Sequence, residues 1–296
     1  MQNNNLSYDN VFLPSKETSH GGLRLKNNKN QKFQFTIITV VLNDYKNIEE
    51  TINSVISQKV NLEFIIIDGG STDGTLEIIK KYDKFINLWI SEKDGGIYHA
   101  MNKGILYSTG SFIGMINSGD LFSKNGLKII ENYINKNKNL DFIFGTVHKK
   151  ILKYKFNPHK IIWSFDFYPS HSAGFFIKNE TQRKLGLYDT NFKLSADHEF
   201  FYRLINKKFI GTSTLKNELV GIFRKVNTSF SSTFSAEEHL NEEVNIRLKH
   251  FQNRLIIMLI IFNNFIRKLF KKKKYRISLY FLFNKIYYVF KQTKNS

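Results

Sequence analysis

The fold is decided by the stretch Phe64-Ile65-Ile66-Ile67-Asp68-Gly69-Gly70-Ser71-Thr72-Asp73-Gly74. Its first four residues are apolar and three of them are β-branched, which is typical of a strand buried on both faces of a parallel sheet. The chain then becomes polar and rich in glycine. Open α/β sheets bind ligands at the carboxyl ends of their strands. Asp68, Ser71 and Asp73 are therefore candidate ligand contacts, with capping of the turn and the next helix as the alternative.

The same pattern of an apolar run followed by a polar loop occurs at three more places. Runs at 35–41, 86–90 and 112–116 lead into Asn43-Asp44, Asp94-Gly95-Gly96 and Asn117-Ser118-Gly119-Asp120. Apolar residues at helical spacing lie between the runs, and one of these helices carries Asn102 and Lys103. Strands that alternate with helices predict an α/β fold with a mostly parallel sheet flanked by helices. The polar loops should then meet in one cleft.

The second half continues the alternation with less regular spacing. It predicts a strand at 141–147, a partner strand antiparallel to it within 149–156, a strand at 171–177, a helix from a capping Asn179 to Leu185, and a helix beginning near Asp197. In the last of these, Phe200, Phe201, Leu204 and Ile205 are expected to face a core. Beyond Phe223 the pattern is harder to read.

Composition suggests three parts along the 296 residues. Residues 1–32 are polar and rich in Asn, without the apolar core of a signal peptide, and are expected to form a loose arm. Residues 33–230 hold the alternating pattern and form the main domain. There is no Cys, which excludes disulfides and thiolate metal sites and suits a reducing compartment.

The tail, residues 231–296, carries much of the net charge of +19. From Arg247 onward there are thirteen Lys and Arg and no Asp or Glu. The apolar segments at 255–262 and 277–290 are shorter than the roughly 18 residues that a membrane-spanning helix needs. Apolar faces beside lysine clusters indicate helices that lie on an anionic membrane surface. A core helix of the domain and a basic arm for nucleic acid are the alternatives. In the main domain the predicted cleft is acidic, which argues against nucleic acid there.

Four segments in this order and spacing resemble the successive motifs of glycosyltransferase family 2. They are Thr36-Ile37-Ile38-Thr39-Val40-Val41-Leu42-Asn43, Asp68-Gly69-Gly70-Ser71-Thr72-Asp73-Gly74, Asp94-Gly95-Gly96-Ile97-Tyr98-His99-Ala100-Met101-Asn102-Lys103-Gly104 and Asn117-Ser118-Gly119-Asp120. The resemblance is closest to the bacterial surface-polysaccharide enzymes similar to colanic-acid glycosyltransferases, and it spans roughly 35–210. It implies the GT-A (Rossmann-like) fold, a nucleotide-sugar donor, a divalent metal and inversion at the anomeric carbon.

Position by position, the resemblance places eleven residues around the donor. Those implied to bind the nucleotide-sugar are Thr39, Asn43, Asp68, Ser71, Asp73, Asp94, Gly95, Asn102, Lys103 and Asn117, with Asp68 at the uracil edge. Asp120 matches the last residue of the metal-binding motif, where Gly119 replaces the second Asp of many relatives. One carboxylate and the donor diphosphate would then hold Mn²⁺ or Mg²⁺, because magnesium often takes few protein ligands.

The motif Ser195-Ala196-Asp197-His198-Glu199-Phe200 resembles the family's acidic segment at a helix start. It implies that Asp197 is the catalytic base, with Glu199 as a rival. Residues two apart on a helix point about 200° apart, so only one of them can face the cleft directly. His171 and Arg224 are candidates for contact with the acceptor or the diphosphate.

Together these features predict an inverting, metal-dependent glycosyltransferase that uses a UDP-sugar. The acceptor is expected to be a lipid-linked glycan of O-antigen, capsule or exopolysaccharide assembly. The expected place is the cytoplasm, at the inner face of the bacterial membrane. A nucleotidyltransferase that makes the nucleotide-sugar is one alternative, although a Gly-rich phosphate loop followed by Lys is missing from the sequence. A non-catalytic nucleotide-sugar-binding protein is the other.

Overall fold

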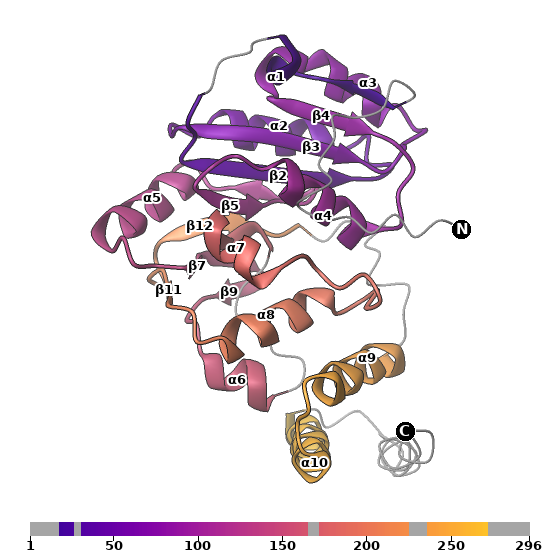
Figure 1. Ribbon diagram of the computed structural model, residues 1–296, viewed down its shortest axis with the longest axis vertical. Helices are drawn as coiled ribbons and strands as arrows, with labels where there is room; N and C mark the ends of the chain where they lie inside the picture. Colours follow the sequence, from indigo (N-terminus) through magenta and orange to yellow (C-terminus); the bar gives the residue numbers. More distant parts are fainter. Residues whose placement is uncertain (1–17, 27–30, 165–171, 225–235, 272–296) are drawn as a thin grey trace.

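The computed structural model describes residues 18–26, 31–164, 172–224 and 236–271. Within them an eight-stranded sheet crosses the molecule (Figure 1). Its strands in spatial order are β1 (Ser19–Gly21), β4 (Leu88–Ser91), β3 (Leu62–Asp68), β2 (Phe35–Val41), β5 (Phe112–Met115), β10 (Phe175–Lys178), β7 (Phe142–Phe144) and β11 (Gly211–Ser213). The four strands β4, β3, β2 and β5 run parallel, as the sequence predicts. Val41 pairs with Asp68 and Asp68 with Ser91, so these strands end at one edge.

Helices cover both faces of this sheet. One face carries α2 (Ile48–Ile56), α3 (Thr75–Lys81) and α5 (Gly126–Lys136); the other carries α4 (Ile97–Tyr107), α6 (Pro158–Trp163), α7 (Asn179–Leu185) and α8 (Ala196–Asn206). Strand β2 is buried along its whole length and is largely apolar. Ile37 belongs to the apolar cluster with α2 and α5, while Ile38 belongs to the cluster with α4. Alternate side chains of one strand point to opposite faces, so two covered faces require a continuous apolar run.

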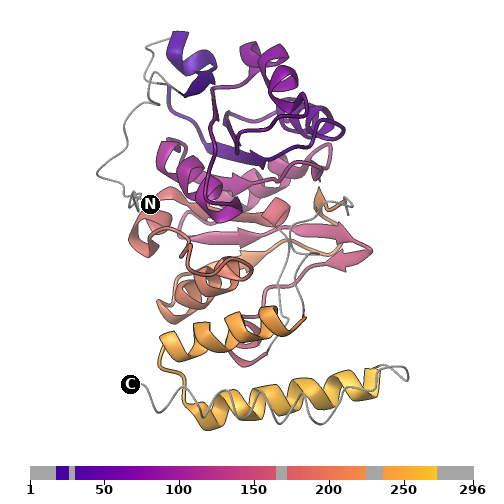
Figure 2. The same ribbon diagram turned by 90° about the vertical axis from the view of Figure 1, so that its right-hand side faces the viewer.

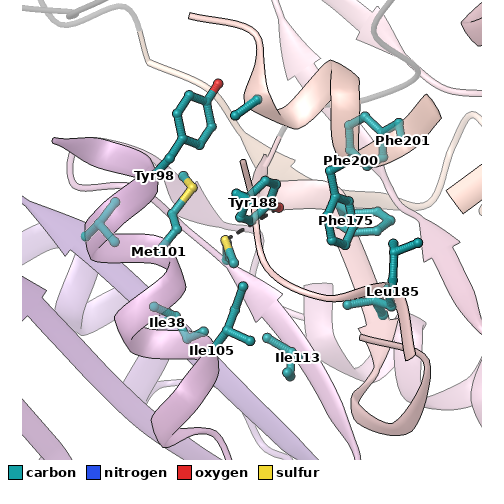
Figure 3. Close-up of a cluster of buried hydrophobic side chains, with 14 of the residues drawn as sticks. Ile38, Tyr98, Met101, Ile105, Ile113, Phe175, Leu185, Tyr188, Phe200 and Phe201 are labelled. Atoms are coloured by element: carbon teal, nitrogen blue, oxygen red, sulfur yellow. Dashed lines mark hydrogen bonds between the residues drawn. The ribbon is translucent and has the colours of Figure 1, made fainter. Parts of the chain in front are cut away.

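An aromatic cluster joins α4 and α8 along their common face of the sheet (Figure 3). Phe201 meets Phe175 with ring centroids 4.9 Å apart, and Tyr188 meets Phe200 at 4.7 Å. In the same view Tyr98 stands at the margin, and its hydroxyl points away from the other rings. The prediction that α8 buries Phe200 and Phe201 is confirmed. Packing at this margin positions the first turn of α8 beside α4.

The predicted strand at 141–147 is two strands, because the chain changes sheets at Gly145. Before it, β7 belongs to the large sheet; after it, β8 (Thr146–Lys149) belongs to a second sheet with the order β6 (Leu121–Phe122), β12 (Leu219–Ile222), β8, β9 (Ile151–Lys153). The Gly145 N–H donates to the Gly174 carbonyl (2.6 Å), and a Cβ at Gly145 would lie 2.7 Å from a Val220 methyl carbon. The antiparallel pairing of β8 with β9 is as predicted.

Part of the predicted loose arm is folded. Residues 19–21 form β1, which pairs antiparallel with β4, and α1 (Leu23–Lys26) follows. Arg24 of α1 pairs with Glu63, a buried residue at the start of β3. The sequence gives no apolar periodicity here, because these contacts use the backbone and two ion pairs, Arg24–Glu63 and Lys26–Asp83. A second, smaller difference is that Asn179 does not cap α7: its Nδ2 donates to the Gly110 carbonyl (2.9 Å).

Two helices of the predicted tail lie within the described residues. The first, α9 (Ala236–Lys249), packs against α8, and α10 (Arg254–Lys271) packs against α9 at the end of the molecule farthest from β1 (Figures 1 and 2). Val244 of α9 and Ile257, Ile260 and Ile261 of α10 form their common apolar cluster. None of the helices in the described ranges combines the length and the apolar character that crossing a membrane requires. The short helices Asp83–Phe85 and Ser172–Gly174 complete the elements.

Candidate active site

A cavity of about 270 Å³ opens at the carboxyl edge of the parallel strands. It is lined by Val40, Val41, Leu42, Asp44, Asp94, Gly96, Ile97, Ala100, Asn117, Ser118, Asp120, Phe223 and Arg224. Three of the four polar loops recognised in the sequence contribute to it directly. The prediction that the strand ends share one cleft is therefore met by these loops, and the cleft contains three aspartates.

The fourth loop, after β3, is joined to the loop after β2 by side-chain hydrogen bonds. Asn43 has a φ of +51°, and its backbone N–H donates to Ser71 Oγ (2.7 Å). In return, Asn43 Oδ1 accepts the N–H of Thr72 (2.8 Å). The Tyr45 N–H donates to Asp73 Oδ2 (3.0 Å). The structure thus brings Asn43, Ser71 and Asp73 into one connected pair of loops beside the cavity.

Asp68 is the anchor of its loop and is only 1% exposed. Its carboxylate accepts the backbone N–H of Ser71 (3.0 Å), the hydroxyl of Ser71 (2.5 Å) and the hydroxyl of Ser91 (2.6 Å). A carboxylate has about four acceptor positions, so most of its capacity is used inside the protein. In this structure Asp68 shapes the loop, and its contact with a uracil edge stays a prediction.

Asp94 lies against the glycines of two loops. Its Oδ1 accepts the N–H of Gly96 (2.8 Å), and a Cβ at Gly69 would lie 3.2 Å from its Oδ2. Gly96 has a φ of +113°, a conformation that L side chains rarely adopt. The exposed Gly95 sits between them. This backbone arrangement holds the Asp94 carboxylate at the cavity wall, where the sequence places a donor contact.

Asp120 faces the same cavity and is 3% exposed. Burial raises its pKa to about 7, although the Arg224 N–H (3.2 Å) and the charges of Lys149 and Arg224 favour the ionised form. The Arg224 guanidinium is directed to the Gly119 carbonyl (2.7 Å) and to Glu50. Arg224 is therefore brought to the site, where it supports the loop that carries Asp120.

The chemistry of this wall suits a hard cation. Among the described residues there is no group of three or more His, Asp or Glu side chains that could hold a metal on its own. However, Asn117 Oδ1 is buried, lines the cavity and has no hydrogen-bond partner in the described part of the chain. Asp120 presents a buried carboxylate to the same cavity. Oxygen ligands of this kind are those that Mg²⁺ and Mn²⁺ prefer, with further ligands drawn from a phosphorylated substrate.

Asp197 lies in the first turn of α8 next to Tyr98 of α4. The Tyr98 hydroxyl is within hydrogen-bonding reach of both the Asp197 carboxylate and the Leu194 carbonyl (3.2 Å), and the His198 N–H donates to Asp197 Oδ1 (2.8 Å). Burial raises the pKa of Asp197, although these contacts and the charge of His198 favour its ionised form. A carboxylate with a raised pKa is suited to accept a proton near neutral pH.

Glu199 points to the opposite side of α8. Its oxygens lie 2.8 Å from Arg203 Nε, 2.9 Å from His250 Nε2 and 3.4 Å from Lys249 Nζ, and the carboxylate is fully buried. Burial would raise the pKa of Glu199, but the hydrogen bond with His250 and the charges of Arg203 and Lys249 hold it below its usual value. The two acidic residues of the motif diverge, and Asp197 is the one on the side of α4.

Three other predicted donor contacts are buried and do not line the cavity. Asn102 donates to the Tyr188 carbonyl and accepts the Tyr188 N–H, both at 2.8 Å. Lys103 is buried and pairs with Glu92 (2.5 Å). Thr39 is fully buried within β2. The structure does not bring these three side chains to the cavity, and His171 lies outside the described residues.

A family model now adds to this geometry. The model described as Glycosyl transferase family 2 matches residues 36–205, more than half of the chain. The chain belongs to glycosyltransferase family 2. It is a glycosyltransferase, and the resemblance seen in its motifs is confirmed.

Several curated relatives carry glycosyltransferase names. An uncharacterized glycosyltransferase of Mycobacterium tuberculosis is 30% identical over 185 residues, which are 57% of this chain and 67% of the relative. A PGL/p-HBAD biosynthesis glycosyltransferase of Mycobacterium bovis is 23% identical, over 72% of this chain and 87% of the relative's own length. The minor teichoic acid biosynthesis protein GgaB of Bacillus subtilis is 25% identical, over 62% of this chain and 22% of its own.

Solved structures confirm the GT-A type of fold for this family 2 chain. TarS of Staphylococcus aureus, residues 1–349 in complex with UDP-GlcNAc, matches with a TM-score of 0.58 at 17% identity, covering 77% of this chain and 72% of that one. The mannosyltransferase PcManGT of Pyrobaculum calidifontis, in complex with GDP-Man and Mn²⁺, matches with a TM-score of 0.58 at 14% identity. The match covers 76% of this chain and 66% of that one.

Sequence reasoning missed two residues of this glycosyltransferase site. Phe223 lines the cavity, and Lys149 Nζ lies 4.3 Å from the centre of its ring. Burial and Lys153 lower the pKa of Lys149, while Asp120 and Asp197 both raise it, so one lysine lies within electrostatic range of both carboxylates. Both residues lie beyond the four motifs: Phe223 directly follows β12 and Lys149 ends β8. The second sheet places Phe223 at the cavity wall and Lys149 beside its ring.

Proposed function

We propose that this family 2 enzyme transfers one sugar, with inversion, from a UDP-sugar to a lipid-linked glycan in the synthesis of a bacterial surface polysaccharide. The observation that carries the proposal is the cavity at the strand ends. Asp94, Asn117 and Asp120 line it. The charge of Lys149 interacts with both Asp120 and Asp197. Such a site can hold a nucleoside diphosphate and its cation on one side and an acceptor hydroxyl on the other.

The proposed reaction is a single displacement. Asp197 takes the proton of the acceptor hydroxyl as its oxygen attacks the anomeric carbon. The bond from that carbon to the diphosphate breaks at the same time, and the diphosphate oxygen keeps the electron pair. The contact from Tyr98 keeps the Asp197 carboxylate oriented. Glu199 remains paired with Arg203 of α8 and Lys249 of α9 throughout.

The proposed cofactor is Mn²⁺ or Mg²⁺, held by Asp120 with the help of the donor diphosphate, and Asn117 Oδ1 is a further candidate ligand. When bound, the metal supplies charge stabilisation for the departing diphosphate. Lys149 and Arg224 would add positive charge at the same wall. The structural neighbours support a nucleotide-sugar donor and a divalent metal, since TarS has been solved with UDP-GlcNAc and the mannosyltransferase with GDP-Man and Mn²⁺.

The donor class can be tested by thermal melting with a panel of UDP-GlcNAc, UDP-glucose, UDP-galactose and GDP-mannose, each with and without Mn²⁺. A ligand that binds only the folded state stabilises it by about 2.7 kcal/mol at a hundredfold excess over its Kd. We expect a UDP-sugar to raise the Tm by several degrees, and to do so more strongly with Mn²⁺. A response to GDP-mannose alone would contradict the UDP assignment, and no response to any donor would contradict the site.

The lipid-linked acceptor is proposed from the tail. On α10, Leu255 and Leu259 are 64% and 67% exposed, on a different face from the residues packed on α9. Lysines and arginines flank this segment in the sequence, and the sequence from Arg247 onward has no acidic residue. An exposed apolar helix face with lysines and arginines nearby suits the surface of an anionic membrane. We therefore place the enzyme at the cytoplasmic face of the membrane, as a peripheral protein.

Co-sedimentation with vesicles tests this placement. We expect the full chain to bind vesicles of phosphatidylglycerol at low salt, and to bind vesicles of phosphatidylcholine much less. The double variant Leu255→Glu and Leu259→Glu should lose about tenfold or more of this affinity, because two charges then enter the apolar face. Leu215→Glu is the matched control, since Leu215 is 62% exposed in the loop before β12. Equal binding by both variants would refute a role for α10.

A further inference from the structure

Glu242 of α9 holds the backbone just ahead of the helix that carries Asp197. Its carboxylate accepts three successive amide N–H groups, those of Lys193 (2.8 Å), Leu194 (2.9 Å) and Ser195 (2.8 Å). Consecutive N–H groups that converge on one anion form a nest, and hydrogen bonds to a charged acceptor are the stronger kind. Glu242 lies beyond the segment that the family model matches, so it belongs to this chain's own carboxyl-terminal part.

The same segment is held from its other side by the active site. The Leu194 carbonyl faces the Tyr98 hydroxyl, which also reaches Asp197. Ser195 immediately precedes α8, and its side chain makes no capping hydrogen bond there. The first turn of α8 therefore takes its position from Glu242 on one side and Tyr98 on the other. Asp197 is two residues after Ser195, so a shift of this segment moves the carboxylate directly.

A second contact from α9 reaches the residue next to Asp197. Glu243 Oε1 lies 3.2 Å from Nδ1 of His198, and Nε2 of the same ring lies 3.3 Å from the Ile161 carbonyl. Two successive acidic residues of α9 thus hold the chain on both sides of Asp197. Helix α9, which the sequence assigns to the tail, therefore supports the first turn of α8.

We propose that Glu242 is a positioning residue for the glycosyl transfer, and that α9 sets the place of the Asp197 carboxylate through the amides of Lys193, Leu194 and Ser195. The proposal rests on the role of Asp197 as the base. It makes the carboxyl-terminal helices part of the catalytic unit and gives them a role beyond contact with the membrane. Misplacing a reacting group by about 1 Å can cost about a hundredfold in rate.

Two variants test this, with the release of nucleoside diphosphate measured on whichever of UDP-GlcNAc, UDP-glucose, UDP-galactose or GDP-mannose the wild type hydrolyses fastest. Glu242→Ala should lower kcat by about a hundredfold. Glu242→Gln keeps the shape and one acceptor oxygen but loses the charge, and should lower kcat about tenfold. The KM for the donor should stay within about twofold, because Glu242 does not line the cavity.

Two controls separate positioning from general damage. Glu180→Gln removes an exposed glutamate of α7 whose ion pairs are with Lys178 and Lys184, and kcat should be unchanged. In the Asp197→Asn background, Glu242→Ala should cause no further loss, because effects that act through one group are not additive. If Glu242→Ala does not fold, Glu242→Gln decides the matter.

Hydrogen exchange gives a readout independent of turnover. The amides of Leu194 and Ser195 should be protected in the wild type and exchange at least about tenfold faster in Glu242→Gln. Unchanged protection, a kcat within twofold of the wild type, or a full additional loss in the Asp197→Asn background would each overturn the proposal. Failure of the proposed function looks different: Asp197→Asn itself would then retain its activity.

Discussion

An Asp197→Asn variant is expected to lose about a thousandfold of kcat, which lies within the range that general base catalysis contributes. The substitution keeps the size of the side chain and leaves an oxygen that can still accept from the Tyr98 hydroxyl and the His198 N–H. The amide cannot take a proton from an acceptor hydroxyl at any ordinary pH. Donor affinity should stay within about twofold, because the residue is not part of the cavity wall. Steady-state kinetics with the donor from the panel, together with donor titration, measure both quantities.

The pH profile of the wild type gives the same assignment a second test. Burial raises the pKa of Asp197, and a general base acts only when it is ionised. Activity should therefore fall on the acidic side at a higher pH than an ordinary aspartate would give, and the residual rate of Asp197→Asn should lack this limb. A variant with full activity would show that this carboxylate is not the base, and would favour a binding protein or another catalytic group.

Glu199→Gln serves as the comparison for Asp197→Asn, because it changes the other acidic residue of the same turn. Its carboxylate is buried among Arg203, Lys249 and His250. Loss of its charge leaves Arg203 and Lys249 poorly paired, which typically costs about 1–3 kcal/mol of unfolding free energy. We expect a lower Tm with a much smaller effect on kcat than Asp197→Asn. The opposite result, a stable but inactive Glu199→Gln, would exchange the roles of the two residues.

The parallel half of the sheet could be predicted because its physics is local. Residues 35–41 form a nearly continuous apolar run and residues 64–67 a continuous one, since both faces of β2 and β3 are covered by helices. Parallel strands end on one side, so the polar loops after them had to gather there. In this part the sequence predicts the strands, the cleft and most of the loops that line it.

The rest depends on contacts between distant parts of the chain. Residues 141–147 look like one strand in the sequence. Packing against Val220 leaves room only for glycine at Gly145, where the chain changes sheets. Asn102 stands in a motif and resembles a ligand contact, yet its amide is paired with the backbone of Tyr188. Glu242 carries no signal in its own neighbourhood, because its partners are the amides of a segment almost fifty residues earlier.

Replacement of Asp120 by asparagine is expected to abolish activity and, at the same time, to stabilise the metal-free protein. Burial raises the pKa of this carboxyl from 3.8 to about 7. A group whose pKa is raised on folding favours the folded state fully below its unfolded value, and this contribution is lost as the pH rises to about 7. At pH 8 the ionised group therefore weighs against the fold by up to about 4 kcal/mol, since each pKa unit corresponds to about 1.36 kcal/mol.

Asparagine is neutral at every pH and can still accept the N–H of Arg224, so most of that free energy should be regained. We expect the Tm of Asp120→Asn to exceed that of the wild type at pH 8 without metal, and the two to converge toward pH 4. Mn²⁺ should raise the Tm of the wild type at pH 8 and leave the variant unchanged. The kcat should fall by about a thousandfold, because charge stabilisation by a metal amounts to several kcal/mol.

These outcomes distinguish a binding site from a structural carboxylate. A buried aspartate that only supported its loop would be harmful to replace, and Asp120→Asn would melt earlier than the wild type at every pH. A variant that is more stable and yet inactive can be explained only if the wild type tolerates an unfavourable buried charge for the sake of a ligand. Retention of Mn²⁺-dependent turnover by Asp120→Asn would place the metal elsewhere, with Asp94 and Asp44 as the remaining carboxylates among the described residues of the cavity wall.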